Sequence, residues 1–177
     1  LRAVYRSSPI VARSRSQIQV SGNEFISRYR VLEQLGSGGG GTVFKCEDIR
    51  TGSLVALKLL TQAEGSSAPQ RFKREARALA VIDHPNVCRV YDTGEYQRVP
   101  FIVVEYLAGV TLRQRFRTRA STAELLYIGR QIADALSAIH FRGIVHRDLK
   151  PANIFVLQED HIKILDFGLA KFLKANV

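Results

Sequence analysis

The sequence predicts an α+β fold, and two periodic patterns support this prediction. From residue 25 onward, short runs rich in β-branched and aromatic residues alternate apolar and polar positions, as half-buried strands do. Beyond Gly109 the apolar residues recur instead at helical spacing, most clearly within residues 121–142. We therefore expect three segments, namely a basic leader (1–24), a β-rich lobe (25–106) and the first part of a mainly helical lobe (107–177).

The composition is that of a globular protein. Its 177 residues are 46% hydrophobic and 24% charged, and no apolar run approaches the roughly 18–20 residues that span a bilayer. Because the chain begins with Leu1 and contains no Met, we expect it to be a fragment. Cys46 and Cys88 are too few and too far apart for a paired-cysteine metal site. They can form a disulfide, but two reduced thiols in a cytosolic protein are the favoured interpretation.

The net charge of +10 is concentrated at the start of the chain, where residues 1–30 contain six Arg and one acid, Glu24. Such a stretch can be a targeting peptide or a basic arm for nucleic acid. It lacks an amphipathic period and an apolar core, so a disordered leader with no specific role is favoured. A second basic run, residues 113–119, is typical of a solvated surface, although it can also contact acidic substrates.

The β-rich lobe is expected to contain five strands and one inserted helix. The glycine run joins the first two strands as a hairpin, and Thr51-Gly52 turns the chain into the third. Pro69 is well placed to start the helix, and His84-Pro85-Asn86 ends it. The expected strands are 29–35, 42–48, 52–60, 87–95 and 100–107, and the expected helix is 70–82.

The second lobe is expected to begin with a long helix and a hairpin. Ser121 and Glu124 predict a capping box at the start of the helix, which ends near Gly143. The helix carries an apolar stripe on one face, and a turn at 158–160 then joins two short strands. The stripe consists of Leu125, Ile128, Ile132, Leu136 and Ile139, and the strands are 153–157 and 161–165.

The run Gly36-Ser37-Gly38-Gly39-Gly40-Gly41 can be a flexible linker or a loop that binds phosphate. A Walker loop is excluded because Thr42-Val43, rather than Lys and Ser or Thr, follows the last glycine. The dinucleotide pattern G-x-G-x-x-G matches, but it must open a helix, and here a strand follows. The pattern G-x-G-x-x-G-x-V of the protein kinase hairpin matches through Val43.

Four further motifs follow the glycines in order. These are Val-Ala-Leu-Lys (55–58), Glu75 in the expected helix, His-Arg-Asp-Leu-Lys-Pro-Ala-Asn (146–153) and Asp-Phe-Gly (166–168). With them, the sequence from about Tyr29 onward resembles a Hanks-type serine/threonine protein kinase of the bacterial style. The resemblance implies a five-stranded antiparallel N-lobe with one helix, the first part of a helical C-lobe, and ATP-dependent phosphorylation of Ser or Thr in proteins.

The resemblance also implies a set of catalytic groups. Lys58 would hold the α- and β-phosphates, with Glu75 as its partner on the helix. Asp148 would accept or orient the proton of the substrate hydroxyl, and Lys150 would contact the γ-phosphate. Lys150-Pro151 further favours Ser or Thr over Tyr as the acceptor.

Metal and nucleotide contacts are implied in the same way. Asn153 and Asp166 would each hold a Mg²⁺ ion. The glycines would cover the triphosphate, and the backbone of the segment 104–107 would bond the edge of adenine. Apolar side chains would enclose the ring, and Val104 would guard the back of the pocket. The implied nucleotide-binding residues are Gly36, Ser37, Gly38, Gly39, Gly40, Gly41, Val43, Ala56, Lys58, Val104, Glu105, Leu107, Asn153, Phe155 and Asp166.

Leu79, Val90, His146 and Phe167 match the stack that links the two lobes in this family, so His146 is expected to be structural rather than a general base. Two other positions depart from the pattern. Gly40 stands where a bulky residue is common. The chain also stops nine residues after Gly168, so we expect the 177-residue segment alone to be inactive.

Two other functions fit parts of the pattern. One is a small-molecule phosphotransferase of similar fold, and the other is a nucleotide-binding pseudokinase or regulatory module. Lys150 within Asp-Leu-Lys-Pro-Ala-Asn and the intact glycine hairpin argue against the phosphotransferase. The intact Lys58, Asp148, Asn153 and Asp166 argue against the pseudokinase. We expect ATP and Mg²⁺ as cofactors, proteins with Ser or Thr acceptors as partners, and a cytoplasmic location. Neither nucleic acid binding nor membrane contact is expected within this segment, and any membrane anchor would lie beyond it.

Overall fold

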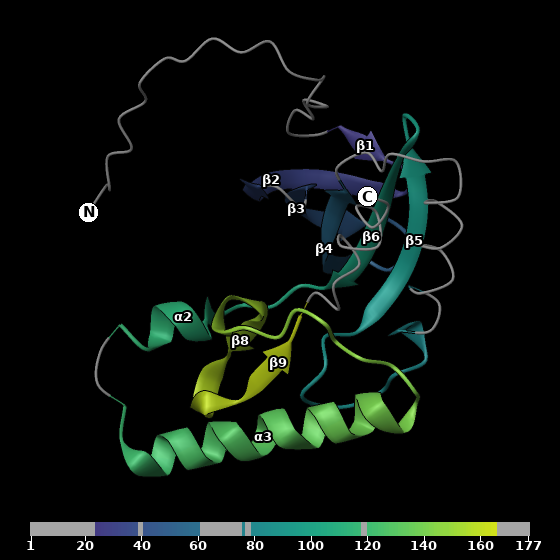
Figure 1. Cartoon of the computed structure of the whole chain (residues 1–177). Helices are drawn as coiled ribbons and strands as arrows, with labels where there is room; N and C mark the ends of the chain where they lie inside the picture. Colours follow the sequence, from purple (N-terminus) through teal and green to yellow (C-terminus); the bar gives the residue numbers. More distant parts are fainter. Residues whose placement is uncertain (1–23, 39–40, 61–75, 77–78, 118–119, 166–177) are drawn as a thin grey trace, which may run out of the picture.

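The structure, a computed structural model, describes residues 24–38, 41–60, 76, 79–117 and 120–165. Figure 1 shows two lobes, an upper one formed by a β-sheet and a lower one in which α3 runs beneath a small hairpin. The strands are β1 (Phe25–Ile26), β2 (Tyr29–Gly38), β3 (Gly41–Asp48), β4 (Ser53–Leu60), β5 (Val90–Tyr96), β6 (Val99–Glu105), β7 (Val110–Thr111), β8 (Ile154–Val156) and β9 (Ile162–Ile164). The helices are α2 (Leu112–Arg115), α3 (Thr122–Phe141) and the 3₁₀ turns η1 (Pro151–Asn153) and η2 (Gln158–Asp160).

The upper sheet is antiparallel, with strand order β1-β2-β3-β4-β6-β5. The α+β class is confirmed, but this sheet has six strands rather than five. Ser27 adopts a left-handed φ of 57°, and the short strand β1 folds back onto β2 and buries Ile26. A two-residue strand is too short to show an alternating pattern in the sequence.

β5 begins at Val90, three residues later than predicted. The preceding residues pair with the lower lobe instead. Val87 forms a parallel bridge with Ile164, and the Cys88 N–H donates to the Ile164 carbonyl at 2.9 Å. The segment before β5 therefore connects the two lobes. Of the expected helix 70–82, Ala76, Leu79 and Ala80 are helical, and most of the remainder lies outside the described residues.

Two hydrophobic clusters support the lobes. One lies within the upper sheet and includes Tyr29, Phe44 and Leu57, each at most 1% exposed. The other joins the underside of the sheet to the lower lobe and includes Leu79, Ile128, Ile139, Ile162 and Ile164. The second cluster couples the position of α3 to that of β9 because both elements bury side chains in it.

α3 confirms the predicted helix, but its buried face differs from the predicted stripe. Leu125 is 49% exposed, whereas Gln131, which the stripe omitted, is buried. Only half of the expected capping box forms, since the Ser121 hydroxyl accepts from the Glu124 N–H at 3.2 Å. The Glu124 carboxylate lies 2.6 Å from Arg115 on α2 instead. The Glu124 side chain thus pairs with a charged residue outside the helix instead of completing the capping box.

Gln131 belongs to a buried amide network. Its Oε1 accepts from Asn86 Nδ2 at 2.8 Å and from the Ile162 N–H at 3.0 Å, and its Nε2 donates to the Asp160 carbonyl at 2.9 Å. Asn86 Nδ2 also donates to the Ile162 carbonyl at 2.9 Å. An apolar side chain at position 131 would leave these groups unpaired inside the core.

Cys46 and Cys88 are both buried and do not form a disulfide. Burial raises the pKa of the Cys46 thiol to about 12, so this side chain behaves as a small apolar residue. None of the helices in the described segments has the length and apolar character needed to cross a membrane.

We predict that Gln131→Leu destabilises the fold although it adds an apolar side chain to an apolar face. Each buried polar group left without a partner costs about 1–3 kcal/mol. Chemical denaturation of the protein that carries these residues measures the change. The matched control is Arg130→Leu on the exposed side of the same helix, which should shift stability by about 0.5 kcal/mol or less. Equal stability of the Gln131→Leu variant and the parent would contradict this prediction.

Candidate active site

A cavity of about 330 Å³ lies between the upper sheet and the lower lobe. The register places Val43 opposite Lys58 and Lys58 opposite Ile102, so these three side chains share one face of the sheet. Phe155 of β8 closes the cavity from below. Of the residues predicted from the sequence, it is lined by Gly36, Val43, Ala56, Lys58, Val104, Glu105, Leu107 and Phe155.

The glycine hairpin joins β2 to β3, and its first glycine, Gly36, lines this cavity. Gly36 pairs with Val43, Ser37 with Thr42 and Gly38 with Gly41. Gly39 and Gly40 lie outside the described residues. A Cβ on Gly36 or Gly38 would meet nothing within 4 Å, whereas a Cβ on Gly41 would collide with the Leu59 carbonyl. Gly41 also has a φ of 127°, so the hairpin itself requires glycine there and leaves open space at the other two positions.

Glu105 ends β6 at the segment that connects the lobes. Its N–H donates to the Arg89 carbonyl at 2.9 Å, so this donor is already used. Its carbonyl accepts from the Cys88 thiol at 3.8 Å, and a second, stronger donor such as an adenine amine can still approach that oxygen. The Glu105 carboxylate lies 2.7 Å from Lys163 Nζ on β9, and the two side chains are 27% and 14% exposed. This ion pair links the connecting segment to the lower lobe.

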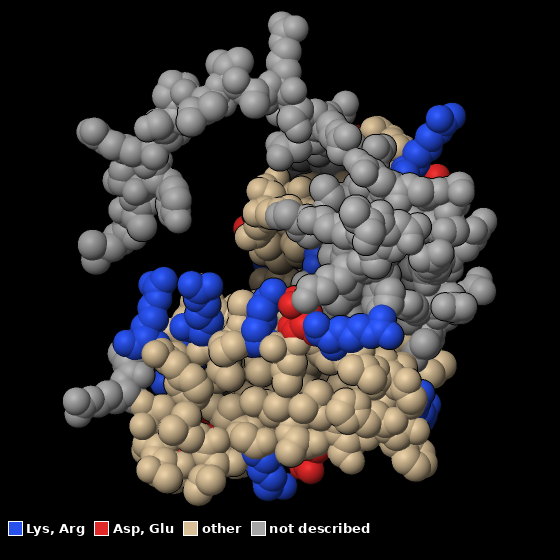
Figure 2. Space-filling view, in the orientation of Figure 1, with Lys and Arg blue, Asp and Glu red and all other residues tan. Residues whose placement is uncertain are grey.

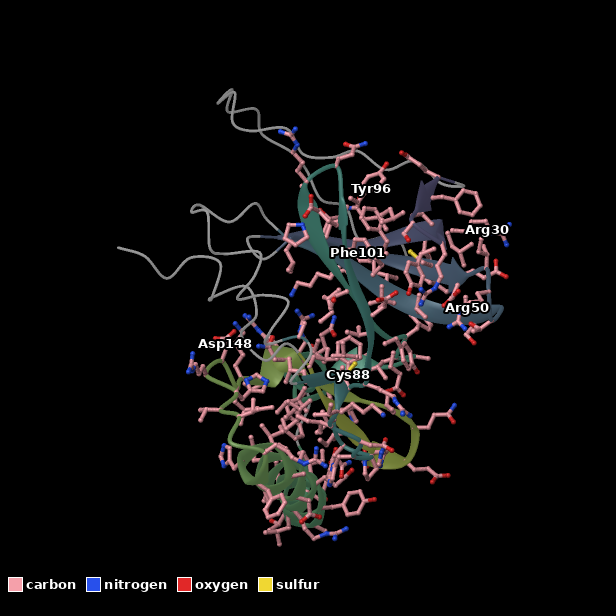
Figure 3. All side chains as sticks on the ribbon, turned by 90° about the vertical axis from the view of Figure 1, so that its right-hand side faces the viewer. Arg30, Arg50, Cys88, Tyr96, Phe101 and Asp148 are labelled. Carbon is pink, nitrogen blue, oxygen red and sulfur yellow. The ribbon has the colours of Figure 1, made fainter. Side chains whose placement is uncertain are left out.

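Asp148 lies on the loop that leads into η1. In Figure 3 it stands at the rim of the lower lobe, below the sheet, whereas Cys88 lies deeper, where the lobes meet. Lys150 Nζ is 2.7 Å from Asp148 Oδ2, and Asn153 Nδ2 is 3.2 Å from the same oxygen. Asn153 Nδ2 also donates to the Asp148 carbonyl at 2.8 Å. A lysine and a buried amide therefore orient the carboxylate together.

His146 supports this loop from inside the lower lobe, where it is buried. Its Nε2 lies 2.8 Å from the Leu165 carbonyl, an acceptor, so this nitrogen carries the proton. Its Nδ1 accepts from the Asp148 N–H at 3.3 Å. Both ring nitrogens are engaged by the backbone, which supports the structural role expected for His146.

Arg147 adopts a φ of 60°, in the left-handed region that side chains other than Gly, Asn and Asp rarely occupy. Such strain persists only where the surroundings hold it. The bonds of its neighbours His146 and Asp148 provide that restraint. The strained residue sits directly beside the candidate base.

Of the two expected metal ligands, Asn153 lies within the described residues. Both hydrogen bonds of the Asn153 side chain use its nitrogen, which leaves the amide oxygen as the atom that can bind a hard cation. Asp166, Glu75 and Phe167 lie outside the described residues. In the described part of the chain, no three His, Cys, Asp or Glu side chains gather as a metal site.

Sequence reasoning missed three features of this site. Cys88 lines the cavity, Lys163 binds Glu105, and the backbone of Leu165 holds the loop. The alternating pattern of residues 161–165 does place Lys163 on the other face of the strand from Ile162 and Ile164. It does not reveal that the partner of Lys163 is Glu105, 58 residues earlier in the sequence.

The comparison with protein families agrees with this geometry. The protein kinase domain matches residues 29–177, and the chain belongs to this family. The sequence is 42% identical over 151 residues to the probable serine/threonine-protein kinase pknA2 of Bifidobacterium longum, covering 81% of this chain and 20% of that protein. It is 37% identical over 159 residues to the serine/threonine-protein kinase PrkC of Bacillus subtilis, covering 88% and 24%. The chain thus spans about a fifth to a quarter of these relatives.

Solved structures give the same assignment. The kinase domain of PknI from Mycobacterium tuberculosis matches with a TM-score of 0.77 and 29% identity, over 85% of this chain and 62% of that one. Rad53 (residues 1–466) in complex with AMP-PNP matches with a TM-score of 0.72 and 31% identity, over 80% and 38%. The architecture of two lobes around one cavity is therefore that of protein kinase domains.

We predict different effects for two glycines of the hairpin. Gly41→Ala should both lower thermal stability and weaken ATP binding, because its Cβ would displace β4. Gly38→Ala should leave thermal stability unchanged, since its Cβ would meet no atom of the hairpin within 4 Å, and should weaken only ATP binding, since the Cβ would occupy space expected for the triphosphate. Thermal unfolding and nucleotide titration of each variant test this. Equal loss of stability in both variants would contradict the open space at Gly38, and unchanged ATP affinity of Gly38→Ala would show that nucleotide does not use that space.

Proposed function

We propose that this chain carries the nucleotide-binding and phosphotransfer site of a serine/threonine protein kinase, with ATP as phosphate donor and proteins as acceptors. One observation carries the proposal: a largely apolar cavity between the lobes has Lys58 on its wall, and the ordered loop of Asp148 and Asn153 lies at the rim of the lobe below it. The serine/threonine kinases among the relatives support the choice of acceptor.

The residues of this site suit phosphoryl transfer, which requires positioning and charge neutralisation more than covalent chemistry. The apolar walls formed by Val43, Ala56 and Phe155 would enclose adenine. Lys58 would hold the α- and β-phosphates. Asp148, oriented through its contact with Asn153, would accept the proton of the substrate hydroxyl, and Lys150 would offset charge on the transferred phosphate.

We propose that Mg²⁺ binds through the amide oxygen of Asn153 and through Asp166. When bound, a divalent cation neutralises charge on the β- and γ-phosphates. The orientation of the Asn153 amide, with its nitrogen held by Asp148, supports the assignment of its oxygen to the metal. We further propose a cytoplasmic location, which the two buried, unbridged cysteines support.

We predict that Lys58→Met, Asp148→Asn and Asp166→Ala each abolish Mg²⁺-ATP-dependent autophosphorylation of the intact protein that carries these residues. Removing a phosphate or proton contact from the transition state costs about 3–4 kcal/mol, or roughly 10²–10³ in rate. The assay is incorporation of labelled phosphate followed by phosphoamino-acid analysis, with phosphoserine or phosphothreonine expected.

The control is Arg50→Met. Figure 3 shows Arg50 on the upper sheet, far from Asp148, so removal of this cation should leave the rate unchanged. Phosphotyrosine as the sole product, or an unimpaired Lys58→Met variant, would refute the proposal. A protein that binds ATP but transfers no phosphate would point to the pseudokinase alternative. The inactivity of the 177-residue segment alone stays a prediction.

A further inference from the structure

α2 and the turn that follows it present two exposed arginines beside the loop that carries Asp148. The helix packs against η1, which begins three residues after Asp148. Leu112 is buried and Phe116 packs against the core, so these two residues fix α2 on the lobe. Arg113 and Arg117, four residues apart, are exposed, and we call them the α2 basic patch.

The two arginines of the α2 basic patch differ in their ion pairing from Arg115, which lies between them in the sequence. Arg115 lies 2.6 Å from Glu124 and 3.6 Å from Asp160, so its charge is balanced within the lobe. Within the segments that the structure describes, no carboxylate forms an ion pair with Arg113 or Arg117. Within the described part of the lobe, their positive charge is not balanced as that of Arg115 is.

Figure 2 shows how charge is distributed around this patch. Lys and Arg side chains line the edge of the lower lobe that faces the hollow between the lobes, above α2, and acidic atoms occupy only a small part of that edge. A cleft bordered by one sign of charge raises the local concentration of molecules of the opposite sign. A ligand drawn to this edge is negatively charged.

The chemistry of the patch favours a carboxylate-bearing peptide over a nucleic acid. A guanidinium binds carboxylates and phosphates alike through two parallel hydrogen bonds, so the distinction rests on the side chains around the patch. Single-stranded nucleic acids also require exposed aromatic side chains on which bases stack. Phe116, the aromatic residue within this run, packs against the hydrophobic core and does not offer such a surface.

We propose that the α2 basic patch binds acidic side chains of the protein substrate, so that this site phosphorylates acceptors flanked by Asp or Glu. The inference rests on the proposed function. A helix is about 10 Å across, and an extended peptide advances about 3.3 Å per residue. A substrate with its hydroxyl at Asp148 would therefore reach the patch with residues roughly two to five positions from the acceptor.

The test compares three peptides that share one acceptor and carry Glu, Gln or Lys at the positions two to five residues away, on either side. Values of kcat/KM are measured with the intact protein, its Arg113→Ala and Arg117→Ala variants, and the double variant Arg113→Glu with Arg117→Glu. We expect the parent to prefer the Glu peptide. Each alanine should lower that preference by about two- to fivefold, as for exposed charge pairs. The double variant should reverse it, and added salt should weaken it.

Arg130→Glu is the matched control, because this exposed arginine belongs to α3, a different helix from α2 (Figure 1). It should keep the preference, and every variant should retain its kcat/KM for the Gln peptide. Equal kcat/KM for the three peptides, or an unchanged preference in the double variant, overturns the inference alone. Absence of turnover on all peptides overturns the proposed function and the inference with it. A single-stranded oligonucleotide that binds through these arginines, without any peptide preference, would assign the patch to nucleic acid and overturn the inference.

Discussion

The catalytic loop depends on the backbone of one residue, Leu165. Its carbonyl lies 2.8 Å from Nε2 of His146, and its N–H donates to the Asn153 carbonyl at 2.8 Å. These two hydrogen bonds hold both ends of the segment 146–153 against the chain that leaves β9. Since small misplacements of reacting groups cost large factors in rate, a loop fixed at both ends suits the role proposed for Asp148.

β9 is itself held by residues distant in sequence. The Ile164 N–H donates to the Asn86 carbonyl at 2.9 Å, and the Ile164 carbonyl accepts from Cys88. Lys163, the residue before Ile164, reaches Glu105 at the end of β6. The strand that supports the loop is therefore bonded to both segments that connect the lobes. Movement of one lobe against the other acts directly on this strand.

Positive charge is placed at three positions around the cavity. Lys58 lies on the upper wall, Lys150 beside Asp148, and the α2 basic patch at the edge of the lower lobe. The proposed polyphosphate would require positive charge inside the cleft, and the proposed acidic protein substrate would require it at the entrance. Arg115 instead balances Glu124, which ties α2 to α3. Arginines close together in sequence thus serve different purposes.

The sequence by itself determined the order of the motifs, most strands and the extent of α3, because glycine runs, alternation and helical spacing are local properties. It also brought Lys58, Asp148 and Asn153 into one hypothesis through the resemblance to a family. The tertiary structure alone decided that Gln131 is buried while Leu125 is exposed, that β1 adds a strand, and that Lys163 binds Glu105. Each depends on partners outside the local segment, and packing against such partners outweighs the weak preferences that a sequence pattern expresses.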